Sequence, residues 1–205
     1  EFRRVLFRSF IWHENRIDAP IIDFHLFANR GFIAGVIANF FLAFFYCVQF
    51  FFIPLHLNSL GYHSSMTIGL ALLPPSLIFA VLSLFSGKIT SKFGARNTLL
   101  CGYMLFILAI IAQLLLDNST NLSLLIGTYL LFGIGWALIL PTSFSTALTA
   151  LPQDKGGVGM GSVGTLHNFG GTVGLALGST LGYVGALNLI LGTSIVAFGI
   201  IMWIM

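Results

Sequence analysis

The stretch FIAGVIANFFLAFFYCVQFFFIPL occupies residues 32–55 and contains no charged side chain. A helix needs about 20 apolar residues to cross the roughly 30 Å of hydrocarbon in a bilayer. Lipid offers the backbone no hydrogen-bond partner, so a run of this length is expected to be helical. The stretch therefore predicts a transmembrane helix, and much of the remaining chain repeats its pattern.

Five further segments are long and apolar enough to span a membrane. They lie at about 67–87, 98–116, 122–148, 158–182 and 187–205. Hydrophobic residues make up 57% of the chain and charged residues only 7%. This composition excludes a soluble domain, whose surface would need far more charge. The predicted fold class is an all-α membrane protein, with a six-transmembrane-helix bundle over residues 32–205.

The basic residues that follow residue 9 fall on one side of the membrane in this topology. They are Arg16 and Arg30 before the first span, Lys88, Lys92 and Arg96 after the second, and Lys155 after the fourth. The other connections carry no Lys or Arg. Short loops rich in Lys and Arg stay in the cytoplasm, so these loops are predicted to be cytoplasmic.

The first 31 residues are expected to lie outside the bundle. Residues 1–9, EFRRVLFRS, resemble the in-frame translation of a sequencing adapter and are set aside. The alternative is a genuine basic segment next to the membrane. Residues 10–31 are predicted to be the end of a preceding helix and a cytoplasmic linker. Without the three arginines of residues 1–9, the basic charge gives no indication of a nucleic-acid partner.

Four stretches with a recognisable pattern follow one another along the chain. They are PIIDFHLFANRGF at 20–32, FFIPLHLNSLGYHSSMTIGLALLPPSL at 51–77, GKITSKFGARN at 87–97 and LPQDKGGVGMGSVGTLHNFGGTVGLALG at 151–178. In the second, Pro54 is expected to end a helix, because proline has no N–H to donate. In the third, Gly87 and Gly94 are expected to permit a tight reversal.

In this order and spacing, the four stretches resemble the C-terminal half of the fourteen-helix drug/proton antiporters of the major facilitator superfamily, the EmrB/QacA-type multidrug efflux group. The resemblance implies that the six spans are helices nine to fourteen of a proton-driven efflux transporter that works by alternating access. It implies the bacterial inner membrane as location. Its partners would be the lipid bilayer, a missing N-terminal bundle and an amphipathic small-molecule substrate, with a periplasmic adaptor as a further candidate.

The third stretch resembles the cytoplasmic loop signature of this superfamily. Gly87, Lys92, Gly94 and Arg96 match the signature, whereas Ser91 stands where the family has an acidic residue. In the family, this acidic residue locks the loop to a neighbouring helix in one access state. The loop therefore has two interpretations, as a gating element or as a basic turn that only sets the topology.

Glycines recur every fourth residue in the fifth predicted span, at Gly170, Gly174, Gly178 and Gly182. Such a ladder lets two helix backbones approach closely. Helix packing is the favoured interpretation, with a place in the substrate pathway as the alternative. Gly159, Gly161 and Gly164 also satisfy the GxGxxG nucleotide-binding pattern, but no strand precedes them and no acidic residue follows.

Polar and aromatic side chains within the first and fourth spans are candidates for a substrate pocket. Asn39, Tyr46 and Phe50 share one helix face, with Gln49 beside it, and Phe132, Trp136, Ser143 and Thr146 align on the other span. In the family these two helices line the central cavity. An aromatic pocket with few polar groups would suit amphipathic drugs, and ordinary contacts between helices are the alternative.

His167 is a titratable side chain within a predicted span, and such residues are functional candidates. His167 and Asn168 are candidates for a proton-coupling role or for contacts between helices. His56 and His63 are expected in a solvated outer loop. No predicted span contains Asp or Glu, and in the family the coupling carboxylates belong to the N-terminal half. The chain alone is therefore not expected to pump.

Other functions remain as alternatives or are excluded. The alternatives are a major facilitator importer of a sugar or metabolite, and a truncated membrane module without transport. An enzyme is not expected, because the spans contain no GxSxG, no HExxH and no paired carboxylates. No cofactor and no metal site are predicted. Cys47 and Cys101 fall on opposite halves of the bilayer, so no disulfide is expected.

Overall fold

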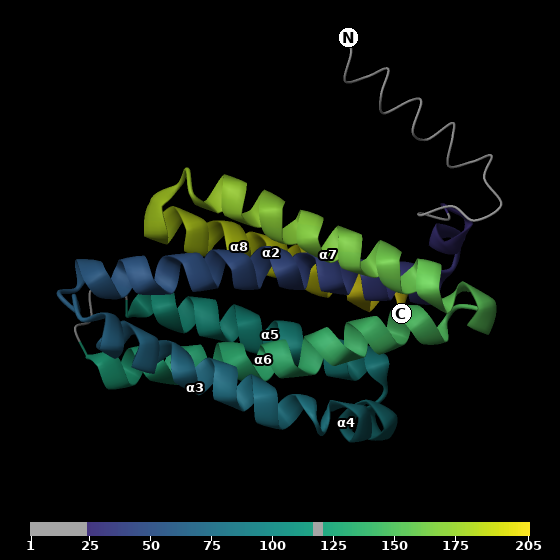
Figure 1. Cartoon of the computed structure of the whole chain (residues 1–205), viewed down its shortest axis with the longest axis horizontal. Coiled ribbons are helices and arrows are strands. Elements are labelled where there is room, and N and C mark those ends of the chain that lie inside the picture. Colours follow the sequence, from purple (N-terminus) through teal and green to yellow (C-terminus); the bar gives the residue numbers. More distant parts are fainter. Residues whose placement is uncertain (1–23, 117–120) are drawn as a thin grey trace, which may run out of the picture.

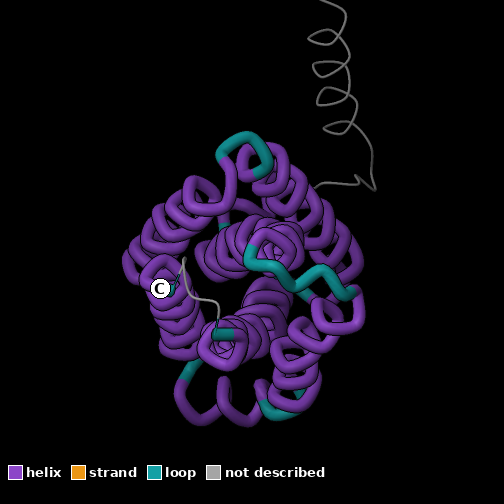
Figure 2. Tube along the Cα trace, turned by 90° about the vertical axis from the view of Figure 1, so that its left-hand side faces the viewer, coloured by secondary structure: helices purple, strands orange, loops and turns teal. Residues whose placement is uncertain are grey.

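The computed structural model describes residues 24–116 and 121–205. The predictions for residues 1–9, for most of the linker and for Arg16 lie outside the described residues. Seven α-helices and two short 3₁₀ segments make up the described part: η1 (Phe24–Ala28), α2 (Arg30–Ser59), α3 (Ser65–Ser83), α4 (Ser86–Phe93), α5 (Ala95–Leu115), α6 (Leu122–Thr149), η2 (Gln153–Lys155), α7 (Gly156–Gly178) and α8 (Gly182–Ile204). The long helices lie side by side in one bundle (Figures 1 and 2).

Five of the described helices, α2, α3, α5, α6 and α8, are long and apolar enough to cross a membrane. The chain is therefore a multi-pass membrane protein. The sequence predicts a sixth span where α7 lies, but α7 does not meet the same criterion. Glycines and the polar residues Thr165, His167 and Asn168 lower its apolar content. Even so, α7 has 23 residues and runs alongside α2 in the bundle (Figure 1).

Helices α2 and α6 form the centre of the bundle. Helix α2 packs against α6, α7 and α8, and α6 packs against α2, α3 and α5. The main core contains stacked rings between these helices, for example Phe45 with Phe106 at 3.9 Å between centroids. The Asn29 side chain accepts from the backbone N–H of Gly31 and caps the start of α2. Its Nδ2 also donates to the Ala150 carbonyl at 2.8 Å, which ties α2 to the end of α6.

The structure corrects two expectations for the first connection. Pro54 does not end a helix, because α2 continues through it to Ser59. His56 is consequently not a solvated loop residue. It is 5% exposed and its ring stacks on Tyr183 of α8 at 3.8 Å between centroids. His63 is exposed, and its Nδ1 lies 3.1 Å from the side-chain oxygen of Asn58.

The second connection also differs from the sequence prediction. Helix α3 ends at Ser83, and the separate helix α4 occupies the segment that was expected to be a tight turn. Gly87 lies inside α4 without a positive φ, so it makes no reversal. Gly94, which lies between α4 and α5, has a φ of 81° and makes the reversal. One glycine in the left-handed region is enough to turn the chain here.

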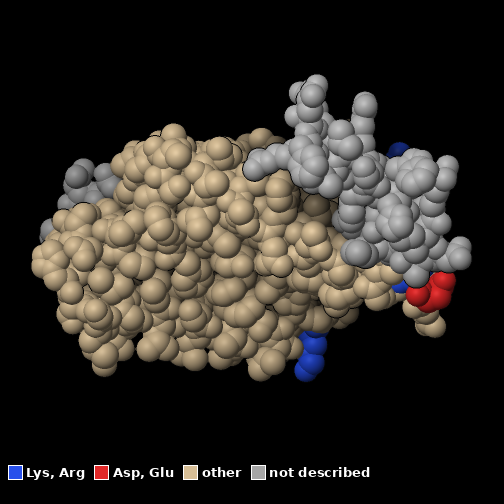
Figure 3. Space-filling model, turned by 45° about the horizontal axis from the view of Figure 1, so that its top comes forward, with Lys and Arg blue, Asp and Glu red and all other residues tan. Residues whose placement is uncertain are grey.

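All charged side chains of the described residues lie near one end of the bundle, which we call the charged end. They are Arg30, Lys88, Lys92, Arg96, Asp154 and Lys155. They belong to the start of α2, to α4, to the start of α5 and to the α6–α7 connection. On the face drawn in Figure 3, the coloured side chains lie toward this end and the rest of the described surface is uncharged. A protein with such a surface fits a bilayer rather than water.

Candidate functional site: a histidine and aromatic cluster between α2, α6 and α7

His167 of α7 connects two polar side chains of α2. Its Nδ1 lies 3.1 Å from Asn39 Oδ1, and its Nε2 lies 3.3 Å from the hydroxyl of Tyr46. An amide oxygen can only accept, so the contact with Asn39 requires a proton on Nδ1. Nε2 of a neutral imidazole then accepts from the Tyr46 hydroxyl. A single neutral tautomer therefore satisfies both contacts.

Aromatic rings surround this chain of hydrogen bonds. Trp136 of α6 stacks on Tyr46 at 5.6 Å between centroids and 13° between planes. Phe50 meets Trp136 edge-on at 5.6 Å, and Phe79 of α3 stacks on the indole at 3.9 Å. Phe132 also contacts Phe50 and Trp136. We call Asn39, Tyr46, Phe50, Phe79, Phe132, Trp136 and His167 the aromatic cluster.

The aromatic cluster is partly open and partly buried. Tyr46, Phe50, Trp136 and His167 are half-buried, whereas Asn39 and Phe132 are fully buried. Two buried donors, Asn39 Nδ2 and Trp136 Nε1, have no hydrogen-bond partner among the described residues. The cluster thus combines flat apolar surfaces with a few polar groups, as small-molecule sites do.

The other predicted site residues, three pocket candidates and Asn168, lie apart from the aromatic cluster. Ser143 and Thr146 each donate to a carbonyl of their own helix, those of Leu140 and Thr142. Asn168 is exposed on α7. Gln49 is buried between α2 and α5, where its Nε2 donates to Gln113 Oε1 at 3.2 Å. The structure therefore does not bring these four residues together with Tyr46 and His167.

Replacing Gln49 by leucine is expected to destabilise the protein by about 1 kcal/mol, because the buried amide of Gln113 loses its hydrogen-bond partner. The double variant Gln49→Leu with Gln113→Leu removes both polar groups and should recover most of this loss. Unfolding of the purified chain in mixed micelles would measure both. If the double variant lost as much stability as the two single variants together, Gln49 and Gln113 would not be coupled.

Three glycines of α7, Gly170, Gly174 and Gly178, lie at a close contact with α2. A Cβ atom built on Gly170 would lie 2.4 Å from the Phe40 carbonyl oxygen, and one on Gly174 would lie 2.6 Å from that of Phe44. A Cβ on Gly178 would lie 3.2 Å from Val48. Gly182 does not belong to this contact. It starts α8 with φ of 70°, and a Cβ there would meet nothing within 4 Å.

The loop signature residues lie on or next to α4. Ser91, at the acidic position of the signature, is exposed, and its hydroxyl donates to the Lys88 carbonyl. The Lys92 ammonium lies 5.3 Å from the centre of the Phe93 ring. Arg96 Nη2 donates to the Met202 carbonyl at 2.9 Å and so attaches the α4–α5 corner to the end of α8. Of these three contacts, the one made by Arg96 joins two helices, whereas those of Ser91 and Lys92 lie within α4.

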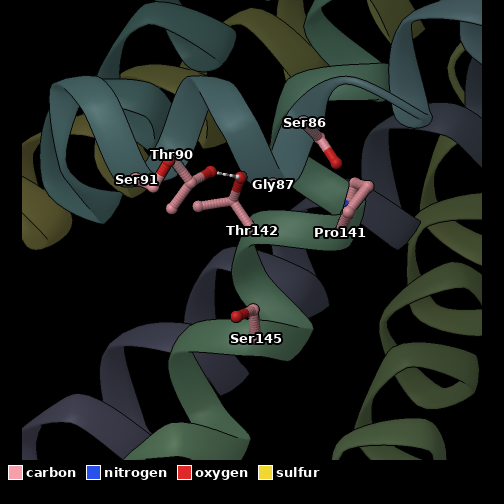
Figure 4. Close-up of a pocket in the computed structure, with 7 residues that line it drawn as sticks. All are labelled: Ser86, Gly87, Thr90, Ser91, Pro141, Thr142 and Ser145. Atoms are coloured by element: carbon pink, nitrogen blue, oxygen red, sulfur yellow. Dashed lines mark hydrogen bonds between the residues drawn. The ribbon is translucent and has the colours of Figure 1, made fainter.

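A pocket of about 330 Å³ lies between α4 and α6. It is lined by Ser86, Gly87, Thr90, Ser91, Pro141, Thr142 and Ser145 (Figure 4). The hydroxyls of Thr90 and Thr142 lie 2.9 Å apart and join the two helices across it. Ser86 and Ser91 donate to carbonyls of the preceding turn. Most of the lining hydroxyls thus already have partners inside the protein.

No metal-binding group of three or more His, Cys, Asp or Glu side chains occurs within residues 24–116 and 121–205. Cys47 and Cys101 are both free thiols, the first half-buried and the second exposed. We therefore take the aromatic cluster as the candidate functional site of the described residues.

Comparison of the sequence with known proteins places the chain in a family. The sequence profile of the Major Facilitator Superfamily matches residues 6–175. The chain is 31% identical over 176 residues to the multidrug resistance protein Stp of Mycobacterium tuberculosis, covering 84% of this chain and 32% of Stp. It is 27% identical to the riboflavin transporter RibZ of Clostridioides difficile, covering 86% of this chain and 39% of RibZ.

The multidrug efflux pump LfrA of Mycolicibacterium smegmatis is 26% identical, with 85% of this chain and 34% of LfrA covered. The chain thus spans about a third of the length of these relatives. The profile covers most of the described helices, including the whole aromatic cluster. The superfamily consists of membrane transporters rather than enzymes, and this chain belongs to the Major Facilitator Superfamily.

Proposed function

We propose that this chain is the C-terminal bundle of a proton-driven multidrug efflux transporter of a bacterial cytoplasmic membrane, and that the aromatic cluster is its part of the substrate pocket. The observation that carries this proposal is the half-buried stack of Tyr46 on Trp136, joined to His167 and flanked by Phe50. Flat aromatic surfaces with few polar groups suit amphipathic substrates of differing shape.

The exposed side of α7 supports the proposal that another bundle completes the pocket. Gly161, Thr165, Asn168 and Thr172 are all exposed on this helix. A stripe of polar and small residues gains little from facing lipid, whereas it suits a close helix contact or a water-filled pathway. The relatives are about three times as long as the matched part of this chain, which leaves room for such a bundle.

A second candidate function is transport of one planar metabolite. The similarity to the riboflavin transporter RibZ favours it, because the two chains match over 86% of this one. A single planar substrate would also fit between stacked rings, with Asn39 Nδ2 and Trp136 Nε1 as hydrogen-bond donors. The two candidates differ in how many unrelated compounds the protein moves.

The test requires the complete reading frame, expressed in a host that lacks its own efflux pumps. Under the main proposal, the protein raises resistance to several unrelated planar and amphipathic drugs, and collapse of the proton gradient abolishes the effect. Uptake of riboflavin without any drug resistance would favour the second candidate. Equal drug sensitivity with and without the protein, and no uptake, would contradict both.

Phe50→Ala is expected to reduce drug resistance at least about fivefold, because it removes an aromatic wall of the proposed pocket. Phe51→Ala is the matched control. Phe51 is the next residue, is 41% exposed and contacts Phe52 rather than the aromatic cluster. The half-inhibitory drug concentration measures both variants at equal expression. Similar losses in the two variants would exclude a specific role for Phe50.

A further inference from the structure

A second cavity lies at the charged end, between the start of α2 and the end of α8. Its volume is about 360 Å³, and it is lined by Arg30, Ile33, Trp203 and Ile204. Arg30 is exposed and makes no ion pair with a described residue, and Trp203 is 87% exposed. The cavity therefore combines one free cation, an exposed indole and two aliphatic side chains.

The walls of this cavity are held in place by hydrogen bonds. Asn29 caps the first turn of α2 and donates to the Ala150 carbonyl, which fixes the backbone that carries Arg30. Arg96 donates to the Met202 carbonyl, in the last turn of α8 next to Trp203. Arg96 places a positive charge at this helix end, which offsets part of the negative pole of α8 next to Arg30.

An exposed track runs along α8 away from this cavity. Gly192, Val196 and Gly199 are exposed, and a Cβ atom on either glycine would meet nothing within 4 Å. These residues lie on the same side of the helix as Trp203, at spacings of three to four residues. The track runs from the charged end toward the uncharged middle of the bundle. An acyl chain whose headgroup lay in the cavity would run in the same direction.

We propose that this cavity binds the headgroup of an anionic phospholipid, with the phosphate at Arg30, the glycerol region against Trp203 and one acyl chain along the α8 track. Arginine pairs readily with phosphate, and tryptophan prefers the membrane interface. Among residues 24–116 and 121–205 the only acidic side chain is Asp154, which does not line the cavity. An anionic lipid is therefore the occupant that matches both the charge and the apolar track.

Native mass spectrometry of the full chain, released from mild detergent, tests this proposal. The chain is titrated with phosphatidylglycerol and with phosphatidylethanolamine of the same acyl chains. We expect tighter retention of phosphatidylglycerol, and about fivefold weaker retention after Arg30→Gln, since one cation near the surface contributes roughly this factor. Lys88→Gln is the matched control, because it removes one exposed charge of the same end outside the cavity.

Three results would overturn the proposal. Equal losses in the two charge variants would indicate diffuse attraction, and equal retention of the two lipids would indicate an apolar groove alone. Displacement of the lipid by inorganic phosphate, with phosphate itself retained, would indicate a site for the free anion. If Arg30→Gln does not yield monodisperse protein, Trp203→Ala on the exposed wall is expected to weaken retention instead. None of these readouts depends on transport, so they are independent of the proposed function.

Discussion

Gly174→Ala is expected to lower the thermal unfolding midpoint of the purified chain by about 5–10 °C. The added methyl would lie 2.6 Å from the Phe44 carbonyl oxygen and 2.9 Å from its Cα. Both atoms belong to the backbone of α2, which cannot rotate away as a side chain can. Overpacking of this kind costs about 1–3 kcal/mol, and each kcal/mol shifts the midpoint of a chain of this size by about 2–4 °C.

Gly164→Ala provides the control on the same helix. A Cβ atom at Gly164 meets nothing within 4 Å, so no neighbour has to move. Alanine also favours a helix over glycine, and the midpoint should stay constant or rise slightly. Thermal unfolding followed by circular dichroism in detergent measures both variants. An unchanged midpoint for Gly174→Ala, or equal decreases for the two, would show that the contact between α7 and α2 does not depend on this glycine.

The sequence identified the α7 glycines by their regular spacing but missed others that are just as tightly packed. A Cβ atom on Gly35 would lie 2.6 Å from the Ser143 carbonyl oxygen, and one on Gly133 would lie 2.6 Å from that of Pro75. Gly102 and Gly135 face each other across α5 and α6. A single glycine gives no periodic signal, since its importance depends on a helix that is distant in sequence.

The ends of helices were also difficult to predict. Proline usually ends a helix, yet Pro54 lies inside α2. The span expected to end at residue 55 therefore stops four residues too early, and this puts His56 in water. In a bundle, packing of the following turn compensates for the lost hydrogen bond, and here the His56 ring stacks on Tyr183. Helical periodicity alone does not report such compensation.

The aromatic cluster was predictable in part. The shared helix face of Asn39, Tyr46 and Phe50 follows from spacing within one helix, and that face lies against His167 and Trp136. Phe79 was missed because α3 is apolar on most sides and offers no reason to single out one ring. The spacing puts Gln49 on the shoulder of the face that carries Tyr46 and Phe50, but its partner Gln113 lies on α5.

His167→Leu is expected to reduce transport by the complete protein at least tenfold. Leucine has a similar size but cannot form either hydrogen bond of His167. Asn39 Oδ1 loses its donor, and the Tyr46 hydroxyl loses its acceptor. Asn39 is fully buried, and its Nδ2 already has no partner among the described residues. Its amide would then have no side-chain partner, an arrangement that costs about 1–3 kcal/mol for each buried polar group. The helix face that carries Tyr46 and Phe50 should rearrange in response.

His167→Gln separates the two roles proposed for this histidine. Glutamine can hydrogen-bond to Asn39 or Tyr46 but cannot take up a proton near neutral pH. If His167 acts by connecting α7 to α2, as the satisfied neutral tautomer suggests, the glutamine variant should retain transport within about threefold of the unmodified protein. A glutamine variant that is as stable as the unmodified protein but transports nothing, at pH 6 and at pH 8, would instead assign the proton-carrying role to His167. Measuring stability and transport on the same preparations keeps loss of folding apart from loss of coupling.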